Sequence, residues 1–80
     1  MNRGVILVEV INSSDLSTEK CKTFSRVSKA EKYFRKLVRD FGITNEDDID
    51  GCLDDGFCDT IDSDGNDVCV MIKEITFEDD

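Results

Sequence analysis

The hydrophobic positions in the amino-terminal part of the chain follow the two-residue period of a β-strand. Residues 5–11 are largely apolar on both faces of an extended chain and rich in β-branched side chains, a pattern typical of a central strand. Residues 19–25 alternate less strictly and include lysines, which are common on the edge of a sheet. Turn-forming residues at 12–15 separate the two segments, so we expect them to pair as a hairpin.

The period then changes to that of a helix. Residues 29–41 carry apolar side chains three or four positions apart, which places them on one face of a helix. Ser28 and Glu31 match a capping box at its start, and Gly42 favours its end. This segment is the main helix that the sequence predicts. Its apolar stripe consists of Ala30, Phe34, Leu37, Val38 and Phe41.

The second half of the chain contains shorter signals. Ile49 and Leu53 lie one helical turn apart, which favours a short second helix over residues 45–54. Residues 57–62 and 68–77 have the composition of strands. An Asp-Gly pair between them is typical of a two-residue type I′ hairpin turn.

These segments predict one α+β domain over residues 1–80, in the order β-β-α-(α)-β-β. The simplest arrangement is a four-stranded, largely antiparallel sheet with one main helix, about 29–41, packed on one face. The strands at 5–11 and 68–77 are the most apolar, so we place them at the centre of the sheet.

Charge is distributed unevenly between the two halves of the chain, which has a formal net charge of −9. Residues 1–43 contain nine basic and five acidic residues, a net charge of +4, whereas residues 44–80 contain one basic and fourteen acidic residues, a net charge of −13. Such acidity repels nucleic acid and anionic membranes and favours a basic protein partner. We therefore expect no direct binding to nucleic acid or to a membrane.

The cysteines are interpreted together with the expected location of the protein. The apolar run at the amino terminus is short and contains Glu9, so we expect no signal peptide and a cytoplasmic protein. In a reducing cytoplasm, cysteines are expected to be small buried apolar residues. A disulfide between Cys58 and Cys69 is one alternative, and a zinc site without a C-x2-C pair is another. The four cysteines are Cys21, Cys52, Cys58 and Cys69.

Catalysis has little support in this sequence. The chain has no His, which is the usual general base and the commonest metal ligand, so no imidazole is available to activate a cysteine nucleophile. We predict no catalytic residue, no cofactor and no metal ligand. Residues 62–67 are similar to the start of a calcium loop, but Asp67 and Lys73 stand where an EF-hand needs Gly and Glu. A weak calcium-responsive module is therefore only an alternative.

The candidate binding segment is residues 46–67, with ten carboxylates in 22 residues. Several of them would repel one another within a helix or across a hairpin. Because folding alone would not select this repulsion, we expect the segment to contact a basic partner; a loosely ordered, solvated surface is the alternative. The predicted partner-binding residues are Glu46, Asp47, Asp48, Asp50, Asp54, Asp55, Asp59 and Asp62.

The basic face of the main helix is evidence against a function that depends on the acidic segment alone. Such a face can bind nucleic acid. We favour a solvated face, or one that pairs with the acidic segment within the molecule or across a dimer. Its residues are Lys29, Lys32, Arg35, Lys36 and Arg39.

In its length, its lack of His and its acidic 46–67 segment, the chain resembles small phage-encoded inhibitors, a class that includes anti-CRISPR proteins and DNA mimics. The resemblance is one of size and charge. It implies a non-enzymatic acidic inhibitor that occupies the basic, nucleic-acid-binding surface of a host defence protein. The alternative is a small oligomerising or regulatory module without a nucleic-acid connection, whose oppositely charged regions meet across a subunit interface.

Overall fold

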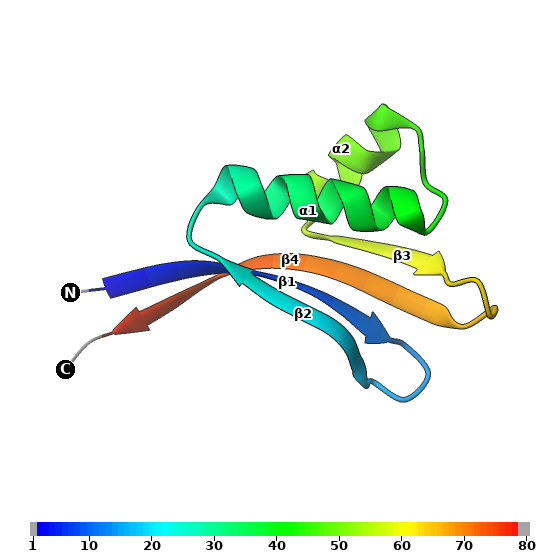
Figure 1. Cartoon of the computed structure of the whole chain (residues 1–80), viewed down its shortest axis with the longest axis horizontal. Helices are drawn as coiled ribbons and strands as arrows, with labels where there is room; N and C mark the ends of the chain where they lie inside the picture. The colour runs from blue at the N-terminus through cyan, green and yellow to red at the C-terminus, as the bar shows by residue number, and fades with distance from the viewer. Residues whose placement is uncertain (1, 79–80) are drawn as a thin grey trace.

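The computed structural model describes residues 2–78 and has two layers, a sheet and a pair of helices on one of its faces (Figure 1). The strands supply the lower layer and the helices the upper layer in this view. In chain order, the elements are β1 (Asn2–Asn12), β2 (Thr18–Phe24), α1 (Val27–Asp40), α2 (Glu46–Asp55), β3 (Phe57–Ile61) and β4 (Asp67–Glu78).

The strands are arranged in the order β2-β1-β4-β3, and all neighbouring strands are antiparallel. The two long apolar strands, β1 and β4, pair at the centre of the sheet, from Asn2 opposite Glu78 to Asn12 opposite Val68. The predicted α+β domain with a four-stranded antiparallel sheet is therefore confirmed, as is the central position of these two strands. The edges of the sheet are formed by β2 and β3.

The sheet is covered by two helices rather than by one main helix. In Figure 1, α1 crosses the sheet and α2 lies beyond it, above β3. Both helices contribute to the core, because Phe34 of α1 and Ile49 of α2 are fully buried. The short second helix is thus an integral part of the fold.

The start of α1 differs from the prediction. Its N-cap is Arg26, which makes no side-chain capping hydrogen bond, and Ser28 lies inside the helix. The capping box predicted at Ser28 and Glu31 is therefore wrong. The buried stripe of the helix provides its stability instead.

The end of α1 agrees with the prediction at Gly42, which has a φ of +103°. The amides of Gly42 and Ile43 donate to the carbonyls of Arg39 at 2.9 Å and Val38 at 3.2 Å. These two bonds form a Schellman motif, which favours glycine at the left-handed position. The motif reverses the chain, so that α2 returns beside the end of α1.

The β3–β4 turn is a three-residue loop and not the predicted two-residue turn. The Asp62 amide donates to the Asn66 carbonyl at 3.0 Å, and the Asp62 carbonyl accepts the Gly65 amide at 3.1 Å. Gly65 has a φ of +86°, as in loops where a left-handed residue follows a type I turn. Asp62 consequently does not lie opposite Asp67, and the repulsion expected between them is avoided.

The cysteines also depart from the prediction. Cys58 is buried, but Cys21 is exposed, and Cys69 is only half-buried. Cys58 pairs with Val70 and faces the core, whereas Cys69 pairs with Asp59 and faces the other side of the sheet. The two thiols therefore lie on opposite faces, and the alternative of a disulfide between them is wrong.

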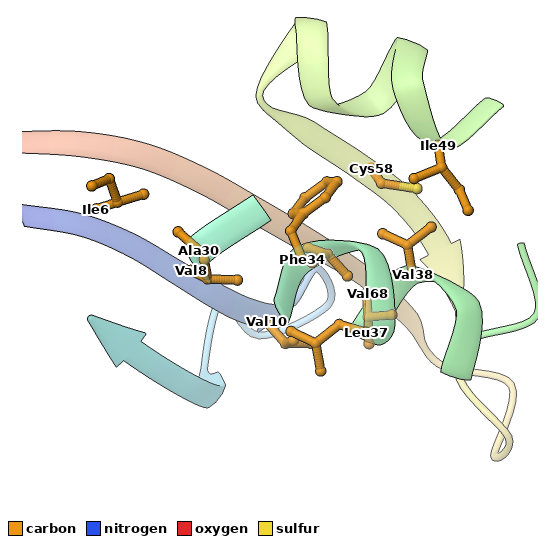
Figure 2. Close-up of a cluster of buried hydrophobic side chains, with 11 residues drawn as sticks. Ile6, Val8, Val10, Ala30, Phe34, Leu37, Val38, Ile49, Cys58 and Val68 are labelled. Atoms are coloured by element: carbon orange, nitrogen blue, oxygen red, sulfur yellow. The ribbon is translucent and has the colours of Figure 1, made fainter. Parts of the chain in front are cut away.

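The core fills the space between the sheet and both helices (Figure 2). Alternate residues of the central strands point into it, and the apolar stripe of α1 packs on them. The cluster consists of Ile6, Val8, Val10, Ala30, Phe34, Leu37, Val38, Ile49, Cys58, Val68 and Val70.

Candidate functional site

The acidic helix α2 is fixed at both of its ends. At the start, the side-chain oxygen of Asn45 accepts the amides of Asp47 at 2.9 Å and Asp48 at 3.3 Å. Acidic residues in this first turn are favoured by the helix dipole. At the other end, Gly56 adopts a left-handed conformation with a φ of +84°. The carboxylates of α2 are therefore held on a defined helical frame.

One flank of α2 faces α1 and is neutralised by it. The Arg35 guanidinium donates to Asp50 Oδ1 at 2.6 Å and to Glu46 Oε2 at 3.3 Å, and Arg39 also pairs with Glu46. The hydrogen bond to Asp50 raises the pKa of Arg35 above its usual value. We call Glu46 and Asp50 the paired flank. Two basic residues of α1 are thus engaged within the molecule, as the favoured interpretation of that face expected.

The other flank of α2 and the neighbouring strand β3 form a shallow hollow of about 460 Å³. We call it the acidic groove. Among residues 4–76, whose side chains the structure describes, no Lys or Arg forms an ion pair with its four carboxylates. These are Asp47, Asp48 and Asp55 of α2 and Asp59 of β3.

The wall of the acidic groove also contains apolar and neutral groups. Phe57, at the start of β3, is 45% exposed, and Ile43 is half-buried. Burial, with a smaller contribution from the neighbouring Cys52, raises the pKa of the Cys58 thiol to about 12. That thiol is therefore protonated at neutral pH, and a protonated thiol is a poor nucleophile.

This combination of groups matches the chemistry of a Lys or Arg side chain. Carboxylates form charge-assisted hydrogen bonds with the cationic head. The exposed ring of Phe57 can contact the aliphatic stem or bind the cation through its π face. The acidic groove can therefore accept a basic side chain of a partner without any rearrangement of the paired flank.

The eight predicted residues are not brought together into one site. Four of them line the acidic groove, two form the paired flank, and Asp54 is exposed on α2. Asp62 lies in the β3–β4 turn, where its carboxylate accepts the amides of Asp64 and Asn66 at 2.9 Å each. These backbone bonds, with that of Asn66 the largest cause, lower the pKa of Asp62.

Asp62 therefore serves the turn. Asp62 is also the first residue of the segment that is similar to a calcium loop, and its carboxylate already accepts these backbone hydrogen bonds. In the part of the chain that the structure describes, no group of three or more His, Cys, Asp or Glu side chains is arranged to hold a metal ion.

Phe57 is the residue of the groove that the sequence analysis did not identify. The available signal was its position at the first residue of an edge strand, next to the acidic helix. Alternation along β3 places Cys58 inward and Phe57 outward.

Comparison with known proteins adds nothing to the interpretation of the acidic groove, which depends on the geometry described above. No protein-family model, curated protein or solved structure matches the chain. Over residues 2–78, α1 and α2 are both too short and too polar to traverse a bilayer.

Proposed function

We propose that this protein is a non-enzymatic acidic inhibitor that binds the basic, nucleic-acid-binding surface of another protein. The observation that carries the proposal is the acidic groove, where four carboxylates line the same hollow as the exposed Phe57 and pair with no basic side chain of the described residues. The charge distribution supports it, because residues 44–80 have a net charge of −13. The proposal places the protein in the cytoplasm, together with nucleic-acid-binding proteins.

The partner that this surface fits presents clustered Lys and Arg side chains. A protein surface that binds nucleic acid has this composition, because it must neutralise phosphates. Attraction between the two surfaces accelerates their encounter and weakens as salt screens the charges. By occupying the same basic side chains, the acidic groove would exclude nucleic acid.

The paired flank is assigned a smaller part in this binding. A partner could engage Glu46 or Asp50 only by competing with Arg35 and Arg39. Binding to the carboxylates of the acidic groove requires no such competition. We therefore assign the main contacts to Asp47, Asp48, Asp55 and Asp59, with exposed Asp54 beside them.

The assignment is tested by titrating the ¹⁵N-labelled protein with an oligo-arginine peptide and following backbone amide shifts. We expect the largest shifts at residues of the acidic groove, and binding that weakens with salt. The double reversal Asp55→Lys/Asp59→Lys should lower the affinity for the peptide by about tenfold or more.

The matched control is Glu19→Lys/Asp64→Lys, which changes the net charge equally at exposed residues outside the groove. It should reduce the affinity much less. If both double variants weaken binding equally, net charge alone determines the affinity, and the assignment to the groove is wrong. Unchanged affinity after reversal of Asp55 and Asp59 contradicts it as well.

A further inference from the structure

The face of the sheet opposite the helices is not covered by any described element of the chain (Figure 1). The residues of β1 and β4 that alternate with the core residues lie on this face. On these two strands, Leu7 is 9% exposed and the other apolar residues of the face are half-buried. On the same side, Phe57 and Ile61 of the edge strand β3 are 45% and 57% exposed. We call it the open face and define it by Val5, Leu7, Ile11, Cys69, Met71 and Ile75.

The centre of the open face is nearly neutral, in contrast to the rest of this acidic chain. At its centre, Lys73 Nζ lies 3.4 Å from Glu9 Oε1, on the neighbouring strand. The Glu9 side chain is only 12% exposed. Asp59 and Asp67 lie on the same side of the sheet but toward its β3 edge. The centre thus has one positive and one negative charge within an apolar surface.

We propose that the open face binds the open face of a second copy, which gives a symmetric dimer with two stacked sheets. Glu9 and Lys73 make the open face self-complementary. A two-fold axis that lies in the interface and passes between these residues brings Glu9 of each copy against the partner's Lys73. The apolar residues on both sides of the pair then face their symmetry equivalents across the interface.

This arrangement also keeps the acidic regions of the two copies apart. In each copy the helices lie on the far side of the sheet from the open face (Figure 1). Stacked sheets pack about 10 Å apart, and each α2 would lie beyond its own sheet, on the outside of the dimer. Repulsion between the acidic segments is thereby reduced. Phe57 and Asp59 of the acidic groove point to the same side of the sheet as the open face, at its β3 edge. The dimer would therefore cover this edge of the groove, whereas Asp47, Asp48 and Asp55 lie on α2.

The size of the open face predicts a weak dimer. Four strands about 4.8 Å apart and seven residues with a rise of about 3.3 Å give a projected area of roughly 450 Å². Two copies would bury roughly twice this area, which lies just below the about 1,000 Å² of a specific interface. We therefore expect an equilibrium between monomer and dimer that shifts with protein concentration.

Sedimentation velocity over a concentration series tests this proposal. The weight-average mass of the wild type should rise with concentration from 9.0 kDa toward twice that value. Ile75→Glu, on the open face and away from β3, should weaken association by about tenfold or more because it places two uncompensated acids in the interface. The control Val27→Glu adds an acid at a 56% exposed residue of α1 and should associate as the wild type does. A wild type that stays at 9.0 kDa at every concentration overturns the proposal.

Charge exchange provides a second, independent test. Glu9→Lys and Lys73→Glu should each weaken the dimer, because each places like charges together. The double variant Glu9→Lys/Lys73→Glu should restore association toward the wild-type level. If the double variant associates no better than either single variant while all three remain folded by circular dichroism, the self-complementary pairing is wrong. Oligo-arginine affinity of Ile75→Glu, measured at a dilution where both proteins are monomeric, should equal that of the wild type, which separates this proposal from the proposed function.

Discussion

The two flanks of α2 have similar composition but different roles. The paired flank, Glu46 and Asp50, holds arginines of α1. On the other flank, Asp48 and Asp55 face a hollow with no basic side chain bound to them in the described part of the chain. The difference teaches that the charge of a segment does not define a binding surface. Only the carboxylates that the fold leaves without a partner are available to another molecule.

The separation of the flanks depends on Ile49, which anchors α2 in the core and is fully buried. Ile49→Ala should have the largest effect of the changes considered below, lowering the free energy of unfolding by about 2–5 kcal/mol. In a domain with about 5–15 kcal/mol of stability, this loss should also loosen α2 and weaken oligo-arginine binding. Urea unfolding followed by circular dichroism measures the change.

The control for this cavity is Val27→Ala, at a residue that is 56% exposed. Its free energy of unfolding should stay within about 0.5 kcal/mol of the wild type. If the free energy of unfolding of Ile49→Ala also stays within about 0.5 kcal/mol of the wild type, α2 contributes little to the core and neither flank has a fixed position.

Gly51 is an exposed residue of α2 that lines the acidic groove, and a Cβ atom added there would meet no atom within 4 Å. Gly51→Ala should therefore raise the free energy of unfolding by about 0.5–1 kcal/mol, since alanine has less backbone freedom to lose in a helix. The expected gain is smaller than the loss at Ile49. Chemical denaturation measures it, and a loss of stability would contradict the regular helical geometry of α2.

The smallest expected effect is on the paired flank. Arg35→Ala should lower the melting temperature slightly, because it frees Asp50 and leaves Glu46 paired with Arg39 alone. The control Lys32→Ala removes the same charge from an exposed residue of α1. The difference between the two variants should disappear at high salt. If it persists there, packing of Arg35 and not its charge connects the flank to α1.

Apolar periodicity was sufficient to predict most of the fold. The strand at 5–11, the helix at 29–41 and the strand at 68–77 each have a buried apolar face, and the spacing of its residues is compatible with few other secondary structures. Local polar signals were less reliable. The predicted capping box at Ser28 failed because the helix begins at Val27, and the Asp-Gly turn gained a residue because Asp62 pairs with Asn66.

The candidate site was predictable only as a segment. The sequence places Glu46 and Asp55 in one acidic run, but their different surroundings arise from the reversal at Gly42, which brings α2 beside the arginines of α1. Alternation along β3 points Phe57 outward, but its position beside the carboxylates of α2 depends on α2 and β3 enclosing a hollow between them. Both features are tertiary, and no local pattern of residues determines them.

The central claim is that the acidic groove and nucleic acid compete for the same basic surface. The most direct measurement uses the tagged protein to capture its partner from the native host and then follows labelled nucleic acid on that partner by fluorescence anisotropy. We expect the wild type and Glu19→Lys/Asp64→Lys to displace the nucleic acid. Asp55→Lys/Asp59→Lys should need about tenfold more protein or fail. A partner that keeps its nucleic acid while this protein is bound, or equal displacement by the groove variant, would contradict the claim.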